Sequence, residues 1–116
     1  MPRDARAYLT DIIEACDAIT DAVSGFDLES YTASRLVRSS VEREFILIGE
    51  AVAALGHRAP QLFDSITRAR RIVDFRNQLT HEYPSVDTAI VWAIVNHDVS
   101  VLRAEAEALM RSVSIE

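Results

Sequence analysis

Residues 37–55, VRSSVEREFILIGEAVAAL, form the longest periodic stretch of the chain and decide its fold. Large apolar side chains recur there at three- and four-residue steps, namely Val37, Val41, Phe45, Ile48, Val52 and Leu55. A helix turns once in about 3.6 residues, so this spacing puts all of them on one face. The stretch therefore predicts a long amphipathic helix that supplies a seam of a helical core.

Gly49 lies inside this predicted helix, where glycine costs about 1 kcal/mol relative to alanine. We expect the glycine to allow the close approach of another helix, because it has no side chain to hold the two backbones apart. A contact within the core and a contact between two copies of the chain would both explain it.

Similar periodicity predicts helices on both sides of the seam, over about residues 3–23, from residue 65 or 67 to residue 82, and from about residue 86 onward. The first of them has an acidic outer face. The whole chain of 116 residues has only three glycines and three prolines, too few for the many turns of an all-β fold. We predict an all-α, antiparallel bundle of four main helices plus a short one, in a single domain over residues 1–116.

Four residues are expected to begin or end these elements. Asp27 can cap a segment that leads into the long helix, and Pro60 can open the short helix. Pro84 must stop the fourth element, and Ser85 is a good cap for the last one.

Composition limits the possible classes of protein. Hydrophobic residues make up 49% of the chain and charged residues 26%, close to the globular norm. The only cysteine, Cys16, excludes an internal disulfide, and neither a signal peptide nor a membrane span is visible, so we expect a cytoplasmic protein without a membrane partner. The net charge of -6 is unusual for a nucleic-acid binder, although four arginines gather just ahead of His81, namely Arg68, Arg70, Arg71 and Arg76.

Residues 74–84, DFRNQLTHEYP, are the one stretch where polar chemistry displaces helical packing. At about 100° per residue, Arg76 and Tyr83 lie roughly 20° apart on one helix edge, whereas His81 lies about 140° from Arg76 and in line with Asn77. One straight helix cannot bring both edges to a single substrate atom. Either the helix unwinds before His81, or two copies of the chain share a site across a two-fold axis.

The residue types suit cleavage of an RNA phosphodiester by its own 2′-hydroxyl. Histidine can take or give a proton near neutral pH, and arginine can hold a phosphate and stabilise charge on its oxygens. Such a reaction requires no metal, and His57, His81 and His97 lack the spacing of paired metal ligands, so we expect neither a metal site nor a cofactor. Taken without further information, Arg76 and His81 also fit a plain solvated helix end.

The spacing Arg76, four residues, His81, one residue, Tyr83 resembles the signature of HEPN-domain toxins of the HepT type. These are the toxin half of HepT/MntA (HEPN/MNT) toxin–antitoxin pairs. The similarity covers nearly the whole chain and continues, in the same order, through Ile48-Gly49-Glu50-Ala51, residues 76–83, Val86-Asp87, Val91-Trp92, His97-Asp98-Val99 and Leu102.

The resemblance implies a HEPN-like helical homodimer that acts as a metal-independent endoribonuclease of a type VII toxin–antitoxin system. Arg76 and His81 of both subunits would be catalytic at the interface, with Asn77 in support. A cognate MntA-like nucleotidyltransferase antitoxin would neutralise the toxin by transferring AMP from ATP to Tyr83, which adds charge and bulk near the RNA phosphate. Independently of the family, the clustering of Arg68, Arg70 and Arg71 suggests that they flank the RNA path, although a solvated helix start explains them equally well.

Two other functions remain open. The chain could be a non-catalytic helical partner subunit of a nucleotidyltransferase, with Tyr83 merely its substrate, or a purely structural bundle. Replacing His81 by alanine distinguishes them, because only the ribonuclease would lose RNA cleavage and growth arrest while its fold stayed intact.

Overall fold

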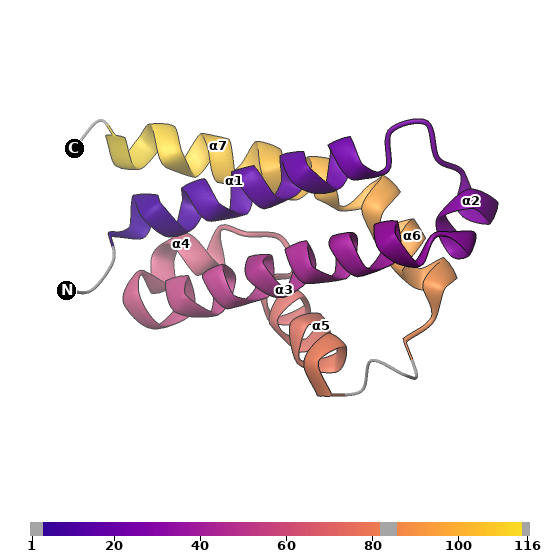
Figure 1. The fold of residues 1–116 in the computed structure, drawn as a ribbon. Helices are drawn as coiled ribbons and strands as arrows, with labels where there is room; N and C mark the ends of the chain where they lie inside the picture. The colour runs from indigo at the N-terminus through magenta and orange to yellow at the C-terminus, as the bar shows by residue number, and fades with distance from the viewer. Residues whose placement is uncertain (1–3, 82–85, 115–116) are drawn as a thin grey trace.

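The computed structural model describes residues 4–81 and 86–114, and both ranges are almost entirely helical. Seven helices occur in these ranges (Figure 1): α1 Ala5–Ala22, α2 Leu28–Ala33, α3 Arg35–Arg58, α4 Pro60–Asp64, α5 Ala69–His81, α6 Thr88–His97 and α7 Val99–Ser114. The prediction of an all-α fold is confirmed. No helix in the described ranges has the length and apolar character needed to span a bilayer.

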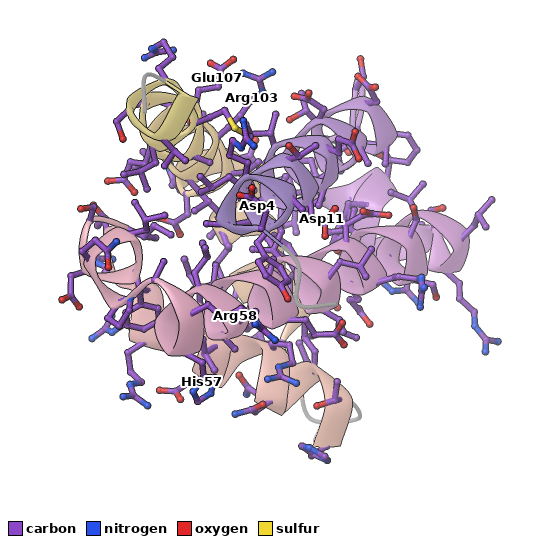
Figure 2. All side chains as sticks on the ribbon, turned by 90° about the vertical axis from the view of Figure 1, so that its left-hand side faces the viewer. Asp4, Asp11, His57, Arg58, Arg103 and Glu107 are labelled. Atoms are coloured by element: carbon purple, nitrogen blue, oxygen red, sulfur yellow. The ribbon has the colours of Figure 1, made fainter. Side chains whose placement is uncertain are left out.

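Helices α1, α3 and α7 lie side by side and form the body of the bundle. Helix α1 packs against both α3 and α7, and it runs antiparallel to each of them (Figure 1). Helix α5 packs on α3 and projects from the side of α3 opposite to α1, as Figures 1 and 2 both show. The residue stretch that carries the polar motif is therefore attached to the bundle mainly through one helix.

The predicted seam of α3 is the centre of the core. Five of its six apolar residues are buried, and Val37, at the start of the helix, is half-buried. They meet the buried face of α1, which consists of Leu9, Ile12, Ala15, Cys16 and Ile19. Burial of such apolar area is the main favourable contribution to folding, so this contact holds the bundle together.

The first predicted caps are found in the structure. Asp27 accepts a hydrogen bond from the Ser30 backbone N–H at 2.8 Å, and the Asp27 N–H donates to the Ser30 hydroxyl at 2.9 Å. This reciprocal pair begins α2. Ser34 then caps α3 by accepting from the Val37 N–H, and Pro60 opens α4 as expected.

The C-terminal part differs from the prediction in two details. The expected single last helix is divided at Asp98 into α6 and α7, although the Leu102 N–H still donates to the Asp98 carbonyl at 3.0 Å. Helix α6 is capped by Asp87, which accepts from the Ala89 N–H at 2.8 Å. Pro84 and Ser85 lie outside the described residues, but the predicted cap at Ser85 is wrong, because α6 begins at Thr88 and is capped by Asp87.

A charged cluster joins α1 to α7 on the outside of the bundle. The Arg103 guanidinium donates to the Asp17 carboxylate at 2.6 Å and lies 3.0 Å from the Glu107 carboxylate. Figure 2 shows Arg103 and Glu107 together on α7. The hydrogen bond from Arg103 lowers the pKa of Asp17 below its ordinary value.

Tyr31 joins α2 to the core beside α6. Its side chain is fully buried, and its ring centroid lies 5.0 Å from that of Trp92. The hydroxyl has no hydrogen-bond partner among the residues that the structure describes. Burial, followed by the negative charge of Glu42, raises the pKa of Tyr31 to about 12, so the phenol stays neutral at physiological pH.

Candidate active site

The start of α5 is fixed to α7 by a side-chain clamp. The Glu105 carboxylate accepts from the Thr67 backbone N–H at 3.0 Å and from the Thr67 hydroxyl at 2.5 Å. Arg68, the next residue, has a φ of 57°, in the left-handed region that non-glycine residues seldom occupy. Helix α5 begins only at Ala69, so the predicted start at residue 65 or 67 is corrected, and Arg68 lies ahead of the helix.

Arg76 lies where α5 crosses α3, directly over Gly49. A Cβ atom built on Gly49 would lie 2.6 Å from Arg76 Cγ and 3.5 Å from Arg76 Cα, and closer still to Arg76 Cβ. The prediction that Gly49 permits a close helix approach is confirmed, and the partner helix is α5 of the same chain. Arg76 Nε is buried and has no hydrogen-bond partner among the described residues.

The other motif residues lie along the exposed side of α5. Asn77 and His81 are both exposed, and His81 is the last residue of the helix. Between them, the Thr80 hydroxyl lies 3.1 Å from the carbonyl oxygens of Arg76 and Asn77, to which it donates. Because α5 is helical through His81, the alternative in which the helix unwinds before this residue is wrong. Tyr83, the predicted modification site, lies outside the described residues.

The arginine cluster ahead of the motif is divided in space. Arg68 and Arg71 line a groove of about 470 Å³ whose walls are mostly apolar side chains from α3, α5, α6 and α7. Asp98 and Glu105 line the same groove and offset the positive charge there. Arg70 is exposed and does not line this groove, and neither does Arg76. The four arginines therefore do not form one continuous strip around a single cavity.

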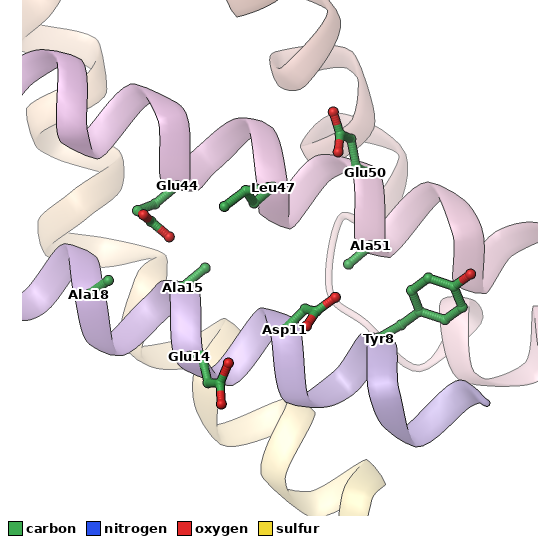
Figure 3. Close-up of a pocket in the computed structure, with 9 residues that line it drawn as sticks. All are labelled: Tyr8, Asp11, Glu14, Ala15, Ala18, Glu44, Leu47, Glu50 and Ala51. Atoms are coloured by element: carbon green, nitrogen blue, oxygen red, sulfur yellow. The ribbon is translucent and has the colours of Figure 1, made fainter. Parts of the chain in front are cut away.

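A second groove, of about 490 Å³, separates α1 from α3 (Figure 3). Its lining contains four acidic residues, namely Asp11, Glu14, Glu44 and Glu50, together with Tyr8, Leu47 and three alanines. Like charge repels a phosphate backbone, so this groove does not suit RNA. The acidic face of the first helix was visible in the sequence, but its pairing with carboxylates of α3 required the fold.

The remaining histidines lie apart from the motif. His57 is exposed at the end of α3, beside Arg58 (Figure 2), and His97 is exposed at the end of α6. Within residues 4–81 and 86–114, no group of three His, Cys, Asp or Glu side chains is arranged to hold a metal ion.

Comparison with known proteins identifies relatives along nearly the whole chain. The chain is 29% identical over 105 residues to the putative RNase MJ1380 of Methanocaldococcus jannaschii, covering 90% of this chain and 95% of that protein. It is 28% identical over 111 residues to the probable ribonuclease HepT of Thermococcus cleftensis, and this alignment covers 96% of this chain and 100% of that protein. No solved structure matches the chain.

A family model described as "Ribonuclease HepT-like" matches residues 12–109, from the first turns of α1 to the last turns of α7. The matched range includes the whole of α5 with Arg76 and His81, and also Gly49 beneath Arg76. The helical fold agrees with this match. The protein therefore belongs to the HepT-like ribonuclease family of HEPN proteins and is an RNA-cleaving enzyme by class.

Proposed function

We propose that the protein is the endoribonuclease toxin of a type VII HEPN/MNT toxin–antitoxin pair and that Arg76 and His81 perform the reaction. The observation that best supports this proposal is the environment of Arg76. The first carbons of its side chain pack on Gly49, and its Nε is buried without a hydrogen-bond partner in the described part of the chain. A cation held in this way loses little freedom on binding a phosphate. His81 follows on the same helix and is exposed to a substrate.

The proposed reaction is a transesterification within the RNA. A histidine takes the proton of the 2′-hydroxyl, the 2′-oxygen forms a bond to phosphorus, and the bond from phosphorus to the 5′-oxygen breaks. A protonated histidine returns a proton to the departing 5′-oxygen, which leaves a 2′,3′-cyclic phosphate and a 5′-hydroxyl. Arg76 stabilises the negative charge that grows on the phosphate oxygens during this exchange.

The unbroken helix supports a site shared by two copies. Arg76 and His81 are separated by about 140° around the helix and by about 7.5 Å along its axis. One chain thus presents the two side chains to different directions, whereas a two-fold axis near α5 brings Arg76 of one copy toward His81 of the other. Such a homodimer also supplies two histidines, one for each proton transfer.

A cognate MntA-like nucleotidyltransferase is the proposed antitoxin, with Tyr83 as its target. The tyrosine oxygen forms a bond to the α-phosphorus of ATP, and pyrophosphate leaves. Tyr83 follows His81 by two residues in the sequence, and AMP on this tyrosine would add a phosphate to the same short stretch of chain. Its negative charge competes with the RNA phosphate for Arg76 and thereby switches the toxin off.

RNA binding by an acidic protein requires local positive charge. Arg70 is the member of the predicted RNA-flanking group that is exposed without lining the groove that holds Asp98 and Glu105. Arg68 and Arg71 are also exposed, but these two carboxylates reduce the local potential. Among the three, Arg70→Ala should therefore reduce RNA affinity and its salt dependence most.

The central test compares two pairs of matched variants in an RNA-cleavage assay. Arg76→Ala and His81→Ala should each lower the rate by about 100-fold or more. Arg58→Ala and His57→Ala remove the same residue types from exposed positions at the end of α3 and should cleave at the rate of the unmodified protein. Full RNA cleavage by folded His81→Ala would remove this histidine from the reaction, whereas unaltered toxicity without RNA cleavage by the unmodified protein would favour the non-catalytic partner subunit.

The dimer and the antitoxin have separate tests. An excess of His81→Ala chains should capture normal chains in mixed dimers and reduce their specific activity, while an excess of His57→Ala should not. Coexpression with the nucleotidyltransferase should add the mass of AMP to a peptide containing Tyr83, and Tyr83→Phe should remain unmodified and toxic. Unchanged activity in the mixing experiment would argue against a shared site.

A further inference from the structure

We infer that Gly49 is a positioning residue for ribonuclease activity, because the absence of its side chain sets the place of the Arg76 guanidinium. The inference rests on the proposed role of Arg76 in RNA cleavage. Gly49 itself would touch neither RNA nor a reacting atom. It acts through the contact that it makes with the stem of Arg76.

The contact between the two residues leaves no room for even a methyl group. An added Cβ on Gly49 would lie 2.6 Å from Arg76 Cγ, whereas ordinary contact begins at 3.4 Å. The obstructed atoms are the first carbons of the Arg76 side chain, and its Cα is only 3.5 Å away. A rotation at the far end of the arginine therefore cannot relieve the overlap, and α5 itself must move.

The required movement is large enough to affect catalysis. Separating the two side chains to normal contact shifts Arg76 by about 1 Å, and a misplacement of this size can reduce a rate by roughly 100-fold. Helix α5 has two buried residues, Ala69 and Leu79, and its other apolar residues are only partly buried against the core, whereas α3 has seven buried residues. The overlap is thus resolved by moving the helix that carries the motif rather than by compressing α3.

Gly56, on the same helix, provides a matched comparison. A Cβ on Gly56 would meet the Phe63 ring at 3.1 and 3.3 Å, a tight contact with the outer atoms of an aromatic side chain. Both glycines carry the same intrinsic cost of about 1 kcal/mol in a helix. Only Gly49 faces Arg76, so an effect specific to position 49 cannot come from helix propensity.

The experiment measures kcat and KM for RNA cleavage by Gly49→Ala and Gly56→Ala, after thermal unfolding shows which variants fold. Gly49→Ala should lose about 100-fold in kcat with a smaller change in KM, while Gly56→Ala keeps normal kinetics. The double variant Gly49→Ala/Arg76→Ala should be no slower than Arg76→Ala alone, because Gly49 acts through Arg76. Normal kcat in folded Gly49→Ala, or losses that multiply in the double variant, would overturn the inference.

A measurement on the unmodified protein keeps the inference testable if Gly49→Ala does not fold. The Nε–H signal of Arg76, identified by its loss in Arg76→Lys, should exchange with water much more slowly than that of exposed Arg70. Equal exchange rates would show that the guanidinium is not held and would reject the inference. If Arg76→Ala cleaves RNA normally, the proposed function fails instead, whatever the exchange rates are.

Discussion

Leu79 anchors the end of α5 that carries His81, and its truncation should loosen the motif. Leu79 is 4% exposed and is the only large buried side chain in the helix, because the other buried residue is Ala69. Leu79→Ala loses the transfer free energy of the removed carbons and leaves a cavity, which together cost about 2–5 kcal/mol. For a chain of this length, that loss lowers the midpoint of thermal unfolding by roughly 10 °C or more.

Leu36→Ala is the matched control for this truncation. The same atoms are removed from a helix, but Leu36 is 82% exposed at the start of α3, so the expected change is below about 0.5 kcal/mol. Urea denaturation of both variants gives the free energies, and hydrogen exchange of the α5 amides reports local opening. Leu79→Ala should raise exchange selectively in α5, and its RNA cleavage should fall further than the unfolded fraction explains.

Two results would contradict the proposed role of Leu79 as an anchor of α5. A loss below about 1 kcal/mol for Leu79→Ala, or an equal loss for Leu36→Ala, would refute the view that burial of Leu79 holds this end of α5 on α3. Uniform exchange throughout the chain would show instead that α5 opens only with global unfolding.

Three further predictions concern stability. Tyr31→Phe should raise the free energy of unfolding by about 1 kcal/mol, because it removes a buried hydroxyl that lacks a partner among the described residues. Tyr31→Leu should lower the free energy of unfolding, because it loses the ring contact with Trp92. Thermal unfolding of both variants tests this prediction. Burial raises the pKa of Cys16 from 9.0 to about 12. The stability that the neutral thiol contributes should therefore be lost as pH rises through this range. Cys16→Ala should flatten the alkaline part of a plot of unfolding free energy against pH, measured by urea denaturation. The lowered pKa of Asp17 acts in the opposite direction. The ionised carboxylate stabilises the fold above the ordinary carboxyl pKa, and this stabilisation is lost as pH falls through the lowered pKa of the folded protein. Asp17→Asn should flatten the acid part of the same plot.

Most helices could be predicted from the sequence because their apolar repeats and capping residues lie close together in the chain. The seam from Val41 to Leu55, the capping pair at Asp27 and the opening of α4 at Pro60 all depend on residues close together in the chain. The break at Asp98 escaped prediction because no glycine or proline marks it and the apolar repeat continues across it. The turn between α6 and α7 is set by what each half packs against, which is a tertiary effect.

The site was only partly predictable for the same reason. The sequence suggested Arg76 and His81 as candidates through their residue types and their spacing, and this assignment stays a prediction, whereas its indication that Gly49 meets another helix is confirmed. It did not identify Arg76 as the partner of Gly49, because that contact joins two helices separated by a turn and by α4. The clamp between Thr67 and Glu105, and the left-handed backbone of Arg68, likewise depend on long-range placement.

The position of the acidic groove relative to α5 has a consequence for how the protein meets a polyanion. Its four acidic residues are carried by α1 and α3, whereas α5, with three of the chain's arginines, projects from the side of α3 opposite to α1 (Figures 1 and 3). This separation of charges contributes to a dipole moment in addition to the net charge of -6. Under the proposed function, an approaching RNA strand would exert a torque that turns α5 toward it, and added salt would screen this torque at distances beyond a Debye length. We expect this torque to favour encounters in which the RNA meets α5 first, and a lower association rate at higher ionic strength would be its signature.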